Sequence, residues 1–263
     1  MQFRNLAIGT VLAIATAVGT QSAALSFNFR VPTHPTLSEV AAPRANMPQT
    51  SNATRFKVRI ENISITNSFT ASNGAKWTLD FSPGVWLISN NDAPLFTVGQ
   101  KDRGQGIEAI AEDGDPTNLA KALQSQKGVQ SSGIFNTAVG AAKAGGIRPG
   151  QVFEFTVTAS PGQKLSLVTM FGQSNDWFYA PQSGIALFDA SGKPIQGDVT
   201  PQMSLWNAGT EVDEEPGIGP NQGPRQKAPN TGVDENGMVQ AVQDQAAYAQ
   251  TSQVMRVTIT PER

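Results

Sequence analysis

The sequence contains no cysteine, and His34 is its single histidine. Without thiols, the chain forms no disulfide, offers no thiolate nucleophile and builds no zinc–thiolate centre. His34 lies between Pro32 and Pro35, in a Pro-rich stretch that is unsuited to holding a catalytic group in place. Histidine-based triads and histidine-ligated metals are therefore excluded from the rest of the chain. Any metal there needs oxygen ligands, which favours calcium or magnesium.

Charged residues are also scarce, at 15% of the sequence, and the net charge is −2. A nucleic-acid-binding protein is expected to carry a basic stripe, and none is present, so nucleic acid is not an expected partner. After the first 24 residues no stretch is apolar enough to cross a membrane as a helix, and we predict no transmembrane segment. A neutral surface rich in Ser, Thr, Asn, Gln and Gly is typical of strand-rich extracellular proteins.

The first 24 residues have the order of a secretory signal peptide. Arg4 supplies the positive start, residues 6–18 are apolar or small, and Ser22 and Ala24 fit the small-residue pattern before a cleavage site. The run is too short to span a bilayer, which takes about 20 apolar residues. We expect residues 1–24 to be removed and the mature protein to be secreted, into the periplasm or out of the cell. A buried N-terminal helix is the alternative interpretation.

The rest of the chain divides into a leader and one domain. Residues 25–54 hold four prolines among Ser, Thr, Asn and Ala, which is typical of a flexible leader. In residues 55–263, alternating apolar and polar residues predict strands separated by Gly/Pro turns, one of them at 82–84. The predicted strands are 56–62, 77–81, 85–88, 152–157, 165–170, 184–188 and 254–259. Helices are predicted at 106–112 and 117–126, and residues 138–144 could be either helix or loop. Seven or more strands favour an all-β antiparallel sandwich with a few short helices in long loops.

Four short motifs carry a family resemblance. They are Phe81-Ser82-Pro83, Ala111-Glu112-Asp113-Gly114, Ser174-Asn175-Asp176-Trp177 and Asn207-Ala208-Gly209-Thr210-Glu211. In this order and at these separations they resemble the spondin N-terminal domain of extracellular spondins and secreted bacterial proteins. The resemblance covers about residues 55–263. It implies an eight-stranded antiparallel Greek-key sandwich that binds one calcium ion through the loops carrying the last two motifs.

The resemblance also implies three metal ligands: Asp176, Asn207 and Glu211. Their chemistry is compatible with calcium, which takes six to eight oxygens from carboxylates, amides, backbone carbonyls and water. Asn207 stands where the family usually has Asp, which removes one negative charge from the site. Asn175 replaces the proline that usually stiffens the first loop. The alternative is that these are ordinary loop residues, with Asp176 capping a turn.

The leading interpretation is a secreted, non-enzymatic binding or adhesion module whose calcium ion orders the loops at one end of the sandwich. Its expected ligand is an extracellular protein or glycan. The second is a carboxylate-based enzyme acting on glycans, which needs only two carboxylates at a suitable separation. The candidate carboxylates are Asp80, Glu108, Asp176, Asp189 and Glu211. The third is a purely structural envelope component.

Two further groups of residues have competing interpretations. The tryptophans could form a carbohydrate-stacking platform, but tryptophans beside strands are more often core residues. They are Trp77, Trp86, Trp177 and Trp206. Residues 213–215, three consecutive acids, could extend the ion site but are expected to form a solvated loop.

Overall fold

The structure is a computed structural model that describes residues 53–90, 95–242 and 250–262. The expected signal peptide and nearly all of the expected leader lie outside these residues. Within them the chain is mostly β, with thirteen strands and three short α-helices. No helix in these ranges is long and apolar enough to cross a membrane.

Eight strands have five or more residues, the number that the resemblance implies. They are β1 (Thr54–Asn62), β4 (Phe81–Ser89), β5 (Val129–Phe135), β6 (Val152–Ala159), β7 (Lys164–Phe171), β8 (Trp177–Pro181), β11 (Met203–Asn207) and β13 (Met255–Glu262). The two-residue strands are β2 (Phe69–Thr70), β3 (Lys76–Trp77), β9 (Ile185–Ala186), β10 (Gly197–Asp198) and β12 (Gln240–Ala241). The helices are α1 (Ile107–Asp113), α2 (Thr117–Leu123), α3 (Thr251–Val254) and the 3₁₀ turn η1 (Thr200–Gln202).

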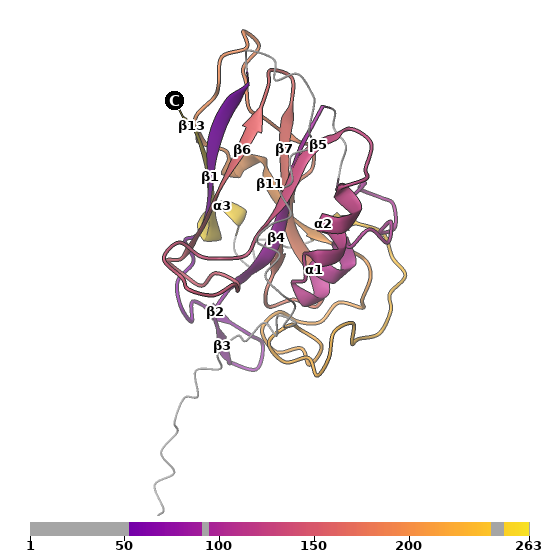
Figure 1. The fold of residues 1–263 in the computed structure, drawn as a ribbon. Coiled ribbons are helices and arrows are strands. Elements are labelled where there is room, and N and C mark those ends of the chain that lie inside the picture. The colour runs from indigo at the N-terminus through magenta and orange to yellow at the C-terminus, as the bar shows by residue number, and fades with distance from the viewer. Residues whose placement is uncertain (1–52, 91–94, 243–249, 263) are drawn as a thin grey trace, which may run out of the picture.

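The long strands form two sheets that pack face to face (Figure 1). The smaller sheet has the order β10-β13-β1-β6, and the larger has β12-β11-β8-β7-β4-β5 with β9 beside β7. Every strand pair is antiparallel. Along the chain, β1, β6 and β13 of the smaller sheet are separated from one another by strands of the larger sheet. The predicted all-β antiparallel sandwich is confirmed.

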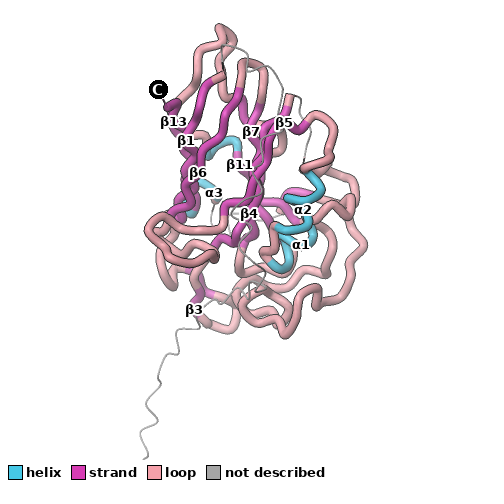
Figure 2. Tube along the Cα trace, viewed as in Figure 1, coloured by secondary structure: helices cyan, strands magenta, loops and turns pink. Residues whose placement is uncertain are grey.

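The larger sheet is buried on both of its faces. Along β4, Ile88 joins the core between the two sheets, whereas Val85 and Leu87 join a second apolar core on the opposite face. The helices α1 and α2 cover this second face, away from β1 and β6 (Figures 1 and 2). They contribute Ile107, Ile110, Leu119 and Leu123 to the second core. The helices predicted from the sequence are confirmed, and they add a third layer to the sandwich.

Two of the predicted strands are wrong in extent, and one turn is misplaced. The predicted turn at 82–84 lies inside β4, where the pairing with β7 shifts register between Phe81 and Gly84. Such a bulge accommodates proline and glycine within a strand. The strand predicted at 77–81 is divided between β3 and β4, and that predicted at 184–188 shortens to β9. The strands β5, β8 and β11 were not predicted.

The tryptophans are core residues, as expected, rather than an exposed platform. Trp77, Trp177 and Trp206 are buried, and Trp86 is half-buried and stacks on Phe155. These side chains are therefore unavailable as a flat surface for stacking on a sugar.

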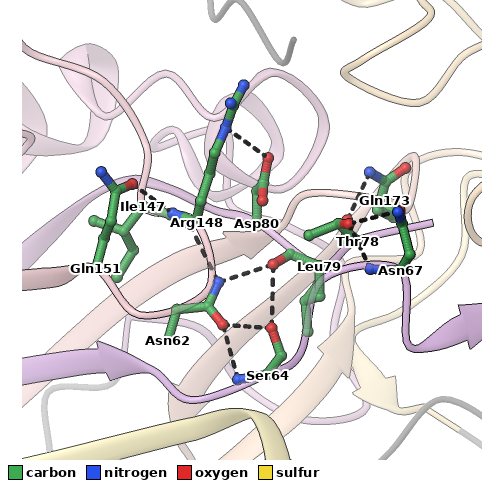
Figure 3. Close-up of polar contacts among 10 residues, drawn as sticks. All are labelled: Asn62, Ser64, Asn67, Thr78, Leu79, Asp80, Ile147, Arg148, Gln151 and Gln173. Atoms are coloured by element: carbon green, nitrogen blue, oxygen red, sulfur yellow. Dashed lines mark hydrogen bonds and ion pairs between the residues drawn. The ribbon is translucent and has the colours of Figure 1, made fainter. Parts of the chain in front are cut away.

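A polar network joins the end of β1 to the start of β4 (Figure 3). The Asn62 Nδ2 donates to the Leu79 carbonyl at 2.8 Å, and its Oδ1 accepts from the Ser64 backbone nitrogen at 3.1 Å. Next to this network, the buried Asp80 carboxylate points toward Arg148, with Nε and Oδ2 3.8 Å apart (Figure 3). Burial raises the pKa of Asp80 to about 6, and the charge of Arg148 acts in the opposite direction.

Candidate metal centre

Strand pairing brings the last two motifs together. Asp176 directly precedes β8, and Asn207 ends β11, where it pairs with Trp177 of β8. The Ala208 backbone nitrogen donates to the Asp176 carbonyl at 3.1 Å, which continues the contact beyond the strands. The two loops that the resemblance implies as a calcium site are therefore neighbours at one end of the larger sheet.

Asp176 is fully buried and links the two loops rather than capping its own turn. Its Oδ2 accepts from the backbone nitrogens of Thr210 at 3.1 Å and Glu211 at 3.3 Å. Its Oδ1 is buried without any hydrogen-bond partner. Burial raises the pKa of Asp176 to about 7, and the charge of Asp213 adds to the rise, while the two backbone donors oppose it. Burial and the neighbouring acid thus favour the protonated form of Asp176 more than its two backbone donors favour the ionised form.

Glu211 is also buried, with 2% of its surface exposed. Its Oε2 accepts from Asn175 Nδ2 at 3.2 Å, so the residue that replaces the family's proline holds this carboxylate. Burial raises the pKa of Glu211 to about 7, and the charges of Glu214, Asp113 and Asp234 add to the effect. Gly232 packs against the carboxylate, and any side chain there would collide with it.

Asn207 shapes its own loop. Its Oδ1 accepts from the Gly209 backbone nitrogen, and its Nδ2 donates to Asp213 Oδ1 at 2.9 Å. The same Asp213 oxygen accepts from Trp177 Nε1 at 2.7 Å. The side-chain oxygen of Asn207 therefore already has one donor, and the role of this residue as a metal ligand stays a prediction.

Sequence reasoning missed Glu112 as a member of this region. Glu112 lies near the end of α1, is 2% exposed, and has an Oε2 without a hydrogen-bond partner. Burial raises its pKa to about 8; the Thr210 hydroxyl opposes this rise, while the charge of Glu211 adds to it. Glu112 belongs to the motif Ala111–Gly114, which the sequence analysis identifies. The periodicity of the helix, however, does not reveal that a loop distant in sequence buries its side chain.

Asp113, the next residue of α1, connects the helix to a further loop. Its Oδ1 accepts from Gln226 Nε2 at 2.9 Å and from the Asn230 backbone nitrogen at 3.2 Å. We call the five carboxylates gathered around these loops the acidic end of the sandwich. Its members are Glu112, Asp113, Asp176, Glu211 and Asp213.

The acidic end contains oxygen donors without a protein counter-ion. None of its carboxylates makes an ion pair with Lys or Arg in the described ranges. In those ranges no three His, Asp or Glu side chains are already arranged around one metal position. The donor chemistry and the orphaned buried oxygen of Asp176 fit a calcium ion, which prefers oxygen ligands. The ligand shell itself is not preassembled.

The run at 213–215 is accessible to solvent, as the sequence predicts, but its side chains also accept hydrogen bonds from other segments. Glu214 Oε1 accepts from Asn221 Nδ2 at 2.6 Å, and Glu215 Oε1 accepts from the Ser72 backbone nitrogen at 2.5 Å. Each of the three acids thus holds a different segment in place.

Two of the carboxylates proposed for glycan chemistry lie in other surroundings. Asp189 closes its own turn, where its Oδ1 accepts from the backbone nitrogens of Ser191 and Lys193. Asp80 faces Arg148. Of the five candidates, Asp176 and Glu211 are joined by a hydrogen bond, from the Glu211 backbone nitrogen to Asp176 Oδ2 at 3.3 Å.

No protein-family model matches this chain, and no curated protein matches it. A functional assignment therefore depends on the sequence motifs and on the chemistry of the acidic end.

Proposed function

We propose that this chain is an exported, non-enzymatic binding module similar to the spondin N-terminal domain, and that its acidic end binds one calcium ion. The observation that carries the proposal is the fully buried Asp176: among the residues that the structure describes, its Oδ1 has no hydrogen-bond partner and no Lys or Arg forms an ion pair with it. A buried, unpaired carboxylate is strongly unfavourable unless it is protonated or coordinates a cation. The resemblance of the motifs around Asp176 and Glu211 supports the second alternative.

Calcium fits this region better than magnesium does. The donors come from two neighbouring loops, and calcium accepts the irregular arrangements that such segments give. Magnesium demands near-octahedral geometry and releases its water reluctantly. Asp176 and Glu211 would hold the ion, with Asn207 and water completing the oxygen set.

The ion would organise a recognition surface. The loop before β8 and the loop after β11 are joined by hydrogen bonds from the backbone nitrogens of Thr210 and Glu211 to Asp176. A bound cation would relieve the repulsion that Asp176 experiences from Asp213 and that Glu211 experiences from Glu214. The ordered loop end is the surface that we propose for an extracellular protein or glycan ligand.

The glycan-acting enzyme has less support. A raised carboxyl pKa, as at Glu112, is what a general acid requires. However, three of the four tryptophans are buried, which leaves no tryptophan platform for a sugar. We therefore keep the binding module as the proposal.

Calorimetric titration of residues 25–263, purified in chelator and then dialysed, tests the proposal. We expect saturable calcium binding at one site per chain, weaker binding of magnesium, and no calcium binding by Asp176→Asn. Asp189→Asn is the matched control because Asp189 is confined to its own turn, and this variant should bind like the wild type. Absence of calcium binding by the wild type would refute the proposal.

A further inference from the structure

Exposed aliphatic side chains gather on the loops at the acidic end of the sandwich. Six large apolar side chains are exposed in the described residues, and three of them are Val212, Val233 and Met238. Val212 is 50% exposed, Val233 is 69% exposed and Met238 is 55% exposed. Single exposed apolar residues are ordinary on a protein surface, whereas a group of them on neighbouring segments is typical of an interaction site.

Backbone pairing brings these residues onto two adjoining segments. The Val212 nitrogen donates to the Val233 carbonyl at 2.8 Å within a short antiparallel pairing, so the two valines lie opposite one another and share a face. Farther along the same segments, the Gly237 nitrogen donates to the Gly209 carbonyl at 2.7 Å, which places Met238 beside this pairing. We call Val212, Val233 and Met238 the apolar strip.

Exposed carboxylates follow both valines of the strip in the chain. None of them makes an ion pair with Lys or Arg in the part of the chain that the structure describes. One basic side chain contacts the segment nearer to Met238, where Lys101 Nζ donates to Asn236 Oδ1 at 2.6 Å. The valine end of the strip therefore combines apolar surface with negative charge that no basic residue neutralises. The carboxylates are those of Asp213, Asp234 and Glu235.

We propose that the apolar strip binds an extended protein segment in which aliphatic side chains are flanked by Lys or Arg. This inference rests on the proposed binding function and names the ligand as a protein rather than a glycan. Burial of the aliphatic side chains would supply affinity, and the carboxylates would steer the basic residues and fix their register. Valine and methionine lack the flat aromatic face on which a sugar ring stacks.

The strip is joined to the proposed calcium site through the chain itself. Glu211, which would hold the ion, directly precedes Val212, and the Glu211 backbone nitrogen donates to Asp176 Oδ2. A cation bound to these carboxylates would fix the segment that presents Val212. Because a segment ordered in advance loses less entropy on binding, calcium should tighten the binding of the protein segment without contacting it.

Peptide selection tests the inference. A phage library of short random peptides is selected on the purified wild-type chain in saturating calcium, after removal of phage that bind the double variant Val212→Ser/Val233→Ser. We expect the enriched peptides to carry aliphatic residues flanked by Lys or Arg. An enriched peptide labelled with fluorescein is then titrated with the wild type and with single variants, and fluorescence anisotropy gives its affinity for each.

The variants separate the apolar contribution from the charge contribution. Val212→Ser and Val233→Ser should each weaken peptide binding about tenfold, as expected for the loss of one buried valine side chain. Asp234→Asn/Glu235→Gln should slow association and reduce its dependence on salt. Val139→Ser is the matched control, since Val139 is 61% exposed but pairs with the start of β6, and it should bind like the wild type.

Two results would overturn the inference, and calcium titration of the same proteins separates them from a failure of the proposed calcium site. If selection enriches no peptide that Val212→Ser weakens, the strip binds no protein segment; a wild type that still binds calcium then leaves the calcium site standing. If the enriched peptides lack basic residues and bind Asp234→Asn/Glu235→Gln like the wild type, the assigned chemistry of the partner is wrong. If the wild type binds no calcium, the calcium site fails, and the peptide results alone decide the role of the strip.

Discussion

The carboxylates on the outer face of the smaller sheet and those of the acidic end lie in opposite electrostatic surroundings. On the sheet, Glu154 contacts Arg59 at 2.6 Å and Lys57 at 3.3 Å, across paired strands. Glu61 and Glu262 are likewise paired with basic side chains. Hydrogen bonding to Arg59 lowers the pKa of Glu154. Here the sequence supplies a counter-ion to each carboxylate, and the face needs no ligand to be electrostatically balanced.

At the acidic end, burial raises the pKa values of Asp176, Glu211 and Glu112, and no Lys or Arg pairs with them in the described ranges. Asp80 lies between these extremes, since it is buried but faces Arg148. The comparison shows that basic side chains neutralise the carboxylates on the outer face of the smaller sheet, whereas none does so for the buried carboxylates of the acidic end in the described residues. At the acidic end, the calcium ion that we propose would take the place of these basic residues.

The largest predicted effect is on the pH dependence of stability without cations. Asp176 and Glu211 have folded-state pKa values of about 7 and Glu112 about 8, above the ordinary values of about 4 in the unfolded chain. The folded state therefore binds more protons, and stability present below pH 4 is lost as pH rises to about 8. One such carboxyl group shifted by about two units changes stability by about 2.6 kcal/mol.

Urea unfolding in chelator at pH 5 and pH 8.5 measures this effect. The free energy of unfolding should be lower at pH 8.5, and saturating calcium should largely remove the difference. The pairs on the smaller sheet act with the opposite sign, because the lowered pKa of Glu154 gives stability that is lost on acidification. If the free energy of unfolding in chelator is the same at pH 5 and pH 8.5, the carboxylates of the acidic end do not have raised pKa values, and the contrast with the smaller sheet is wrong.

The next effect is stabilisation by calcium. A ligand that binds only the folded state adds about 2.7 kcal/mol at a hundredfold excess over Kd. The melting temperature of the wild type should rise accordingly, and Asp176→Asn should abolish the rise. Because the buried negative charge is removed, Asp176→Asn should not destabilise the cation-free protein at pH 8.5. A variant that unfolds in chelator would show that Asp176 is needed for structure instead.

The sequence predicts a strand well when only one of its faces is buried, and poorly when both faces are buried. Alternation predicted β1, where Phe56, Val58 and Ile60 are buried between exposed or half-buried polar residues. It failed for β8, because all five residues of that strand are buried and no alternation remains. The motifs placed Asp176 and Glu211 in neighbouring loops. Glu112 could not be found in this way, since its burial depends on packing between α1 and distant loops.

A smaller effect concerns the loop backbone that carries Thr210 and Glu211. Gly209 has φ +69°, and a Cβ atom there would lie 2.6 Å from the Met238 backbone nitrogen. Gly209→Ala should therefore destabilise the protein by about 1–3 kcal/mol beyond the cost of the left-handed conformation alone. Gly162→Ala is the matched control, since Gly162 has φ +88° and open space around it. If Gly209→Ala and Gly162→Ala lose the same unfolding free energy, the loop at Gly209 can shift to accommodate the added Cβ atom at little cost.

The smallest effect is expected on the outer face of the smaller sheet. Arg59→Ala removes contacts with Glu154 and Glu61, all of them partly exposed. Such pairs contribute about 0.2–1 kcal/mol and are screened by salt. The loss measured by urea unfolding should shrink in high salt. A loss of several kcal/mol that persists in salt would mean that this face has a packing role beyond charge balance.

Diffraction from crystals of residues 25–263 grown with calcium tests the central claim most directly, through the anomalous signal of the ion. We predict one calcium peak at the acidic end, with oxygens of Asp176 and Glu211 about 2.3–2.6 Å away. A structure in which the acidic end holds no ion at saturating calcium, while its carboxylates stay buried and unpaired, would contradict the account.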